Sequence, residues 1–365
     1  MSRVPRLAVA AWALAAAGLV ALAVAVNHYL SASGGSRHHD HALIRGGATD
    51  PIDQLVGRPL LTAWQLDAIA VAVAVLALAL YLTGVALVPV RTPGTRWPVR
   101  RTVAFVAGLA VMVFATCGSI AVYDQVLFTA HMAGHLALVM VAPALLAAGR
   151  PLALTLAAAR PARRQRLARI VTGRVVSLLT APPLALVSYT VVIVGSHLTG
   201  LMDVIMRNAW AGQVEHLVYL VAGYQFFVLI VGDEPIRWRL SSPARWLLLA
   251  LAMAVDTFTG IVLMQGTHAV HLEPSALGVD ALADTHTGGA IMWFGGDGIM
   301  AVIMVVLVVG WLRTADRVPE RRGWLEQARG ATFTEHTGAG DDAGLDEDDA
   351  ARQAYNQWLE RLNHP

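Results

Sequence analysis

Eight apolar runs, each long enough to cross a lipid bilayer as a helix, dominate this chain of 365 residues. They lie at roughly 7–26, 66–90, 102–122, 126–148, 175–196, 213–232, 246–267 and 289–312. Hydrophobic residues make up 56% of the chain and charged residues only 14%, a balance typical of polytopic membrane proteins. Because backbone inside lipid must satisfy its own hydrogen bonds, the runs predict an all-α, polytopic transmembrane helix bundle.

The runs divide the chain into three parts. Residues 1–64 hold an N-terminal span and a polar, His-rich loop, residues 65–312 a seven-span core, and residues 313–365 an acidic tail with a short helix predicted over 346–363. The first run is also compatible with a cleaved signal peptide, but its length of about 20 residues favours a retained span. The His-rich segment 37–41 is predicted either to bind a metal ion weakly or, as we favour, to form a solvated loop.

Arginine is distributed unequally between the connections of the predicted spans. Fourteen arginines lie in the connections after spans two, four and six, and four lie in the opposite connections. By the positive-inside rule, the Arg-rich connections and both termini are predicted to be cytoplasmic, in the plasma membrane. The net charge of +2 therefore reflects membrane topology and does not indicate nucleic-acid binding.

Histidines gather at the predicted external ends of the spans, where they form a candidate metal site. The candidate ligands are His131, His135, His197, His216, His268, His271 and His286. His131 and His135 are four residues apart on one predicted helix, so both side chains lie on the same face and can offer two nitrogens to one ion. For this pair alone, hydrogen bonding near the membrane interface is the alternative to ligation.

Two methionines and three carboxylates extend this candidate site. Met132 and Met292 fall near the same helix ends, and thioether with imidazole suits Cu(I), although each methionine alone is more typical of a core or lipid contact. Glu215 precedes His216, whereas Asp256 and Asp297 lie deeper within spans. Asp256 is expected either to orient a ligand or to join spans through Tyr224 or Gln225, and the second role is slightly favoured.

Several function classes find little support in the sequence. The single cysteine, Cys117, rules out an intramolecular disulfide and a Cys-based metal cluster within one chain. Glu215 beside His216 is the one adjacent base candidate, so a metallohydrolase is the least supported class and no enzyme is expected. The residues leave the metal identity and the oligomeric state open.

Three segments of the core resemble a known family, the CtaG-type cytochrome c oxidase assembly factors in their polytopic, Gram-positive form. The segments are His131-Met-Ala-Gly-His135 with Pro143 and Gly149-Arg-Pro, the pair Glu215-His216, and Asp284-Thr-His-Thr-Gly-Gly-Ala-Ile-Met292-Trp293. The resemblance covers roughly 65–312. It implies a plasma-membrane protein that helps to build a haem–copper oxidase by supplying copper to the catalytic subunit. An external copper donor is a conceivable further partner, besides membrane lipid.

Two alternatives to this copper-binding assembly factor remain open. A b-type cytochrome or quinone-linked electron carrier would use histidines of two helices as axial haem ligands. Haem is not expected, because His197, His268 and His286 lie at extreme helix ends, which suits an ion entry site better. A copper or zinc transporter would need polar groups through the full membrane depth, and below the outer third Asp256 is the main one.

Overall fold

The fold was analysed in a computed structural model that describes residues 64–124, 127–207, 209–231, 234–270, 279–315 and 356. Within these ranges the chain is helical and contains no strand, which confirms the predicted all-α polytopic bundle. The predicted first span, the segment 37–41, His271 and the predicted tail helix lie outside the described residues. The chain divides into two compact units, Met1–Met304 and Val305–Pro365.

In the described part of the chain, six helical segments are long and apolar enough to cross a membrane. They are Ala68–Arg91, Val99–Tyr123, Phe128–Ala158, Trp210–Ile230, Ser242–Gln265 and Ala281–Leu312. The predicted span 175–196 forms instead the shorter apolar helix α12, Pro182–His197. The prediction set its start too early, because Pro182 and Pro183 begin a new helix and the preceding residues form the separate helix α11, Arg174–Leu179.

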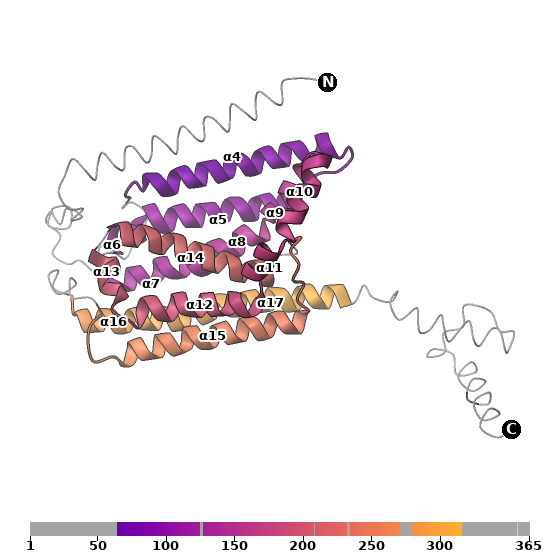
Figure 1. The fold of residues 1–365 in the computed structure, drawn as a ribbon. Coiled ribbons are helices and arrows are strands. Elements are labelled where there is room, and N and C mark those ends of the chain that lie inside the picture. The colour runs from indigo at the N-terminus through magenta and orange to yellow at the C-terminus, as the bar shows by residue number, and fades with distance from the viewer. Residues whose placement is uncertain are drawn as a thin grey trace. The chain divides into compact units, whose positions relative to one another are not determined.

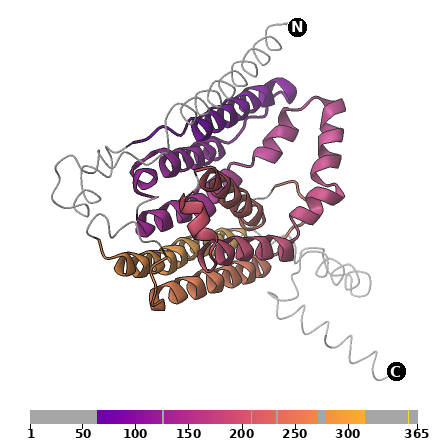
Figure 2. The same ribbon diagram turned by 60° about the vertical axis from the view of Figure 1, so that its left-hand side comes forward.

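The segment that carries His131 and His135 forms the centre of the bundle (Figures 1 and 2). It runs through α7 (Phe128–Leu136), the π-helical turn η1 (Ala137–Val141) and α8 (Ala142–Ala148). Its residues Val139 and Met140 are fully buried. Helix α14 (Ala209–Ile230) packs directly on this turn, because a Cβ at Gly223 would lie 2.1 Å from the Val139 carbonyl oxygen.

A second helical segment begins beside α7. It consists of α16 (Ala281–Ala290), η3 (Ile291–Gly295) and α17 (Gly296–Ala315). The Asp284 carboxylate caps α7, accepting hydrogen bonds from the backbone N–H groups of Phe128 (2.7 Å) and Thr129 (3.2 Å). Gly289 contacts Gly260 of α15 (Ser242–Gln265), where neither position has room for a Cβ. The motif Asp284 to Gly289 therefore joins α7, α15 and α16.

The Gly149-Arg150-Pro151 segment makes a tight turn at the other end of α8. Arg150 has a left-handed φ of 54°, and Pro151 begins α9 (Pro151–Ala158). The Glu234 carboxylate accepts hydrogen bonds from the Leu152 and Ala153 N–H groups, at 3.1 and 2.8 Å. Burial raises the pKa of Glu234, although these hydrogen bonds and the nearby Arg150 oppose the shift. The Gly149-Arg150-Pro151 segment is thus explained by the turn that it forms in the fold.

The remaining helices complete the bundle and its connections. Helix α4 (Ala68–Arg91) leads to α5 (Val99–Cys117) and α6 (Ser119–Tyr123), α10 (Pro161–Val171) precedes α11, and α13 (Leu201–Arg207) lies between α12 and α14. Many apolar side chains of α4 are exposed, among them Val73 and Leu80, as expected of a helix that faces lipid. No buried side chain belongs to α10, which carries four arginines.

Candidate functional site

The candidate site lies at one end of the bundle, where α7, α14 and α16 begin and α12 and α15 end; we call this the histidine end. Figure 1 shows α6, α13 and the start of α7 at this end and α9 to α11 at the other. Helix α7 supplies His131 and His135, α12 ends at His197, and α14 supplies Glu215 and His216. Residues far apart in the sequence thus meet here.

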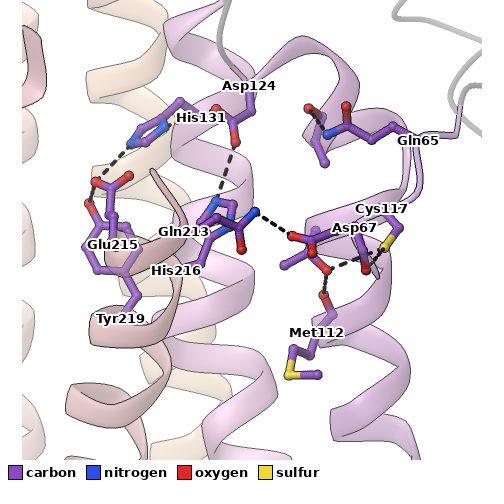
Figure 3. Close-up of polar contacts among 12 residues, drawn as sticks. Gln65, Asp67, Met112, Cys117, Asp124, His131, Gln213, Glu215, His216 and Tyr219 are labelled. Carbon is purple, nitrogen blue, oxygen red and sulfur yellow. Dashed lines mark hydrogen bonds and ion pairs between the residues drawn. The ribbon is translucent and has the colours of Figure 1, made fainter. Parts of the chain in front are cut away.

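The first layer of the site joins three helices through charged and ring groups (Figure 3). Asp124, which follows α6, places one carboxylate oxygen 3.5 Å from His131 Nδ1 and the other 3.5 Å from His216 Nε2. Glu215 Oε1 lies 3.7 Å from His131 Nε2 and accepts a hydrogen bond from the Tyr219 hydroxyl. A carboxylate therefore lies on each side of the His131 ring.

The second layer, one helical turn further along α7, consists of rings. His135 packs edge-to-face against His197, with ring centroids 4.6 Å apart, and against Tyr219 at 4.2 Å. The centroids of His131 and His197 are 6.1 Å apart, so the two layers adjoin. His131, His135 and His197 are all at least 96% buried. A histidine so deep in a membrane protein needs a partner or a ligand.

The hydrogen bonds of His197 define its tautomer. Its Nδ1 lies 2.8 Å from the Ile193 carbonyl oxygen and 2.8 Å from Ser196 Oγ. The Ser196 hydroxyl already donates to the Val192 carbonyl, so both neighbours of Nδ1 can act as acceptors. Nδ1 therefore carries the proton, and Nε2 of the neutral ring presents a lone pair to the site.

Several ring nitrogens at the histidine end have no hydrogen-bond partner among the described residues. These buried atoms are His131 Nε2, both nitrogens of His135, His197 Nε2 and His216 Nδ1. Buried polar atoms in this state are uncommon, and five of them lie at this one end of the bundle. As the side chains are arranged, no three His, Cys, Asp or Glu residues of the described ranges form a ready metal-binding group.

Other predicted candidates lie elsewhere. His268 is exposed and its ring contacts Thr267, whereas His286 Nε2 is hydrogen-bonded at 2.9 Å to the carbonyl of Gly266, the residue after α15. Neither ring contacts the three buried imidazoles in the described structure. Met132 and Met292 are completely buried, and Met132 packs where α16 approaches at Gly288.

The deep carboxylates form a separate polar group. Asp256 is fully buried, and the Tyr189 hydroxyl donates to its carboxylate, lying 3.0 Å from Oδ2 and 3.2 Å from Oδ1, which joins α15 to α12. The prediction that Asp256 pairs with Tyr224 or Gln225 was wrong. The Tyr224 hydroxyl has no hydrogen-bond partner in the described part of the chain, and Gln225 accepts from Ser188 instead. Asp297 accepts from Thr257 at 2.9 Å.

Sequence reasoning missed two residues that organise the site, Asp124 and Tyr219. Asp124 lies in a short connection where no helical period links it to His131. A signal for Tyr219 was available, because it follows Glu215 by four residues on one helix.

Comparisons with known proteins identify the family of this chain. The cytochrome c oxidase caa3 assembly factor family matches residues 79–314. Uncharacterised proteins of Mycobacterium leprae and Mycobacterium tuberculosis are 32% and 31% identical over 71% and 72% of this chain. The chain spans 41% of the length of these relatives, and no solved structure matches it. The chain belongs to the cytochrome c oxidase caa3 assembly factor family.

Proposed function

We propose that this assembly factor binds copper as cargo at His131, His135 and His197 and supports its insertion into the catalytic subunit of the oxidase. The observation that carries the proposal is the cluster of buried ring nitrogens without hydrogen-bond partners. Imidazole nitrogen is a ligand that suits copper. A cargo role in assembly needs no catalytic group, which agrees with a non-enzymatic protein.

Copper binding needs only local adjustment of these rings. His197 Nε2 already carries a lone pair, and neither nitrogen of His135 has a hydrogen bond to break within the described structure. Rotation of the His135 ring, centred 4.6 Å from His197, would direct one of its nitrogens to an ion shared by the pair. His131, one turn away on α7, then completes a three-nitrogen set.

The same distances argue against an electron-carrying b-type cytochrome. Ligation of haem by two histidines places the porphyrin between the two rings. The His135 and His197 rings are in edge-to-face contact, so no porphyrin fits between them.

The proposal places the protein in the plasma membrane with the histidine end outside. The Arg-rich connections then lie in the cytoplasm, as the positive-inside rule requires. Copper arriving from the external face would meet Asp124 and Glu215 first, and these carboxylates attract a cation. From there the second layer could pass the ion laterally to an oxidase subunit in the same membrane.

The test is to replace His135 and His197 by alanine, separately and together, with His268→Ala as the control histidine outside the cluster. Copper(I) affinity of the purified protein is measured by competition with a chromogenic chelator, and copper in the assembled oxidase by elemental analysis. We expect at least a tenfold loss of affinity in each variant and a copper-poor oxidase, with His268→Ala unchanged. Full copper loading of the oxidase in the double variant would refute the proposal.

A further inference from the structure

Asp124 is the carboxylate that joins the two helices bearing His131 and His216. Each of its oxygens faces a different ring, Oδ1 the Nδ1 of His131 on α7 and Oδ2 the Nε2 of His216 on α14, both at 3.5 Å. Its side chain is only 15% exposed. Figure 3 shows Asp124 above both rings, on the connection between α6 and α7.

The charge state of Asp124 follows from these neighbours. A ring nitrogen of His131 and one of His216 each lie 3.5 Å from a carboxylate oxygen, and two imidazole N–H groups facing one carboxyl group favour its ionised form. An ionised carboxylate only accepts hydrogen bonds. The ring nitrogens that face Asp124 must therefore carry the hydrogens.

This requirement sets opposite tautomers in the two rings. In neutral His131 the proton lies on Nδ1 and the lone pair on Nε2, whereas in neutral His216 the proton lies on Nε2 and the lone pair on Nδ1. His131 Nε2 and His216 Nδ1 are also the nitrogens without a hydrogen-bond partner in the described part of the chain. One nitrogen of each ring faces Asp124, and the other has no hydrogen bond. His131 Nε2 lies 3.7 Å from Glu215 Oε1, so an ion bound at this nitrogen would replace the contact with Glu215.

We propose that Asp124 is a positioning residue of the copper site, which selects the tautomer of His131 and His216 and so directs the Nε2 lone pair of His131 toward the ion. The copper part of this inference rests on the proposed function. Histidines that bind metals usually donate their second N–H to a carboxylate or carbonyl, and loss of such a partner lowers metal affinity about 10- to 100-fold. The Ile193 carbonyl plays this part for His197, because it accepts the hydrogen bond of the Nδ1–H group.

The chain provides a matched control in Asp67. Its carboxylate caps α4 through Ile69 and Ala70 and accepts a hydrogen bond from Gln213 at 2.7 Å. Asp67 thus contacts the same helix, α14, but none of its described contacts involves a histidine. Asp67→Asn removes a charge near the site without touching an imidazole.

The experiment compares Asp124→Asn, Asp124→Glu and Asp67→Asn in the full-length protein in lipid nanodiscs. The first readout is the ¹⁵N spectrum of the imidazoles in metal-free protein, with signals assigned through His131→Gln and His216→Gln. In Asp124→Asn the amide offers one oxygen and one donor, so at least one of the two rings must change tautomer. Asp124→Glu keeps the carboxylate and should restore both tautomers, whereas Asp67→Asn should leave the spectrum unchanged.

The second readout is Cu(I) affinity by chelator competition. We expect the Cu(I) affinity of Asp124→Asn to be about 10- to 100-fold lower than that of the wild type. Asp124→Glu should recover much of this affinity, and Asp67→Asn should match the wild type. Unchanged tautomers or unchanged affinity in Asp124→Asn would overturn the positioning role. If the wild-type protein binds no Cu(I) although Asp124→Asn alters the tautomers, the copper function fails while tautomer selection by Asp124 stands.

Discussion

At the residue scale, the bundle keeps two kinds of buried polar group apart. At the histidine end, ring nitrogens have no hydrogen-bond partner among the described residues, whereas deeper in the bundle the Tyr189 hydroxyl donates one hydrogen bond, shared between both oxygens, to Asp256. Nitrogen lone pairs without hydrogen bonds suit ligand binding, whereas a hydrogen-bonded carboxylate suits the joining of helices. Asp256 therefore joins two helices, whereas the histidines remain the proposed ligands.

This distinction predicts different effects for two variants of Asp256. Asp256→Asn keeps an oxygen for Tyr189 and should unfold near the wild-type temperature. Asp256→Leu leaves the buried Tyr189 hydroxyl without a partner, which costs about 1–3 kcal/mol, and should lower the midpoint of thermal unfolding in detergent. Copper affinity, corrected for folded protein, should remain unchanged in both. A selective loss of copper in Asp256→Asn would show that this carboxylate belongs to the metal pathway.

At the element scale, α14 approaches the π-helical turn η1 closely at Gly223. A Cβ at Gly223 would lie 2.1 Å from the Val139 carbonyl oxygen and 2.7 Å from Pro143 Cγ. Backbone atoms cannot move aside without displacing the helix, and α14 also carries Glu215, His216 and Tyr219. The position of this helix thus determines both the packing and the site.

Gly223→Ala should therefore destabilise the bundle, whereas Gly212→Ala on the same helix has nothing within 4 Å and serves as the control. Overpacking of this kind costs about 1–3 kcal/mol, measurable as a lower unfolding midpoint and a lower yield of folded protein. Both substitutions favour helix equally, so a difference between them isolates the contact. Equal stability of the two variants would mean that α14 does not approach η1 this closely.

The helices themselves were largely predictable, since length and hydrophobicity determine which segments can cross a membrane. That His131 and His135 lie on the same face of one helix also follows from their spacing of four residues. The partner rings do not follow from the sequence. His197 and His286 both lie at helix ends on the same side, yet only His197 packs on His135, because helix packing decides which ends meet. Asp124 lies in a connection and has no periodic pattern to reveal it.

At the scale of the whole molecule, the two ends of the bundle differ in chemistry. The histidine end carries Asp124, Glu215 and the buried imidazoles, whereas α10, at the other end, carries four arginines and no carboxylate. Arginine-rich connections remain in the cytoplasm during membrane insertion. This asymmetry predicts the direction from which an ion reaches the site.

Single-cysteine labelling of intact cells with a membrane-impermeant maleimide tests this orientation. Cys117 is 3% exposed, so the wild-type protein should give almost no background. Arg163→Cys, on the exposed α10, should label only after the cells are permeabilised, and Thr267→Cys, at an exposed position two residues after α15, should label without permeabilisation. Labelling of both variants after permeabilisation controls for access to the thiols. If Arg163→Cys labels in intact cells and Thr267→Cys does not, the histidine end faces the cytoplasm. Copper would then have to enter from inside the cell, and delivery from the external face, as proposed, would be wrong.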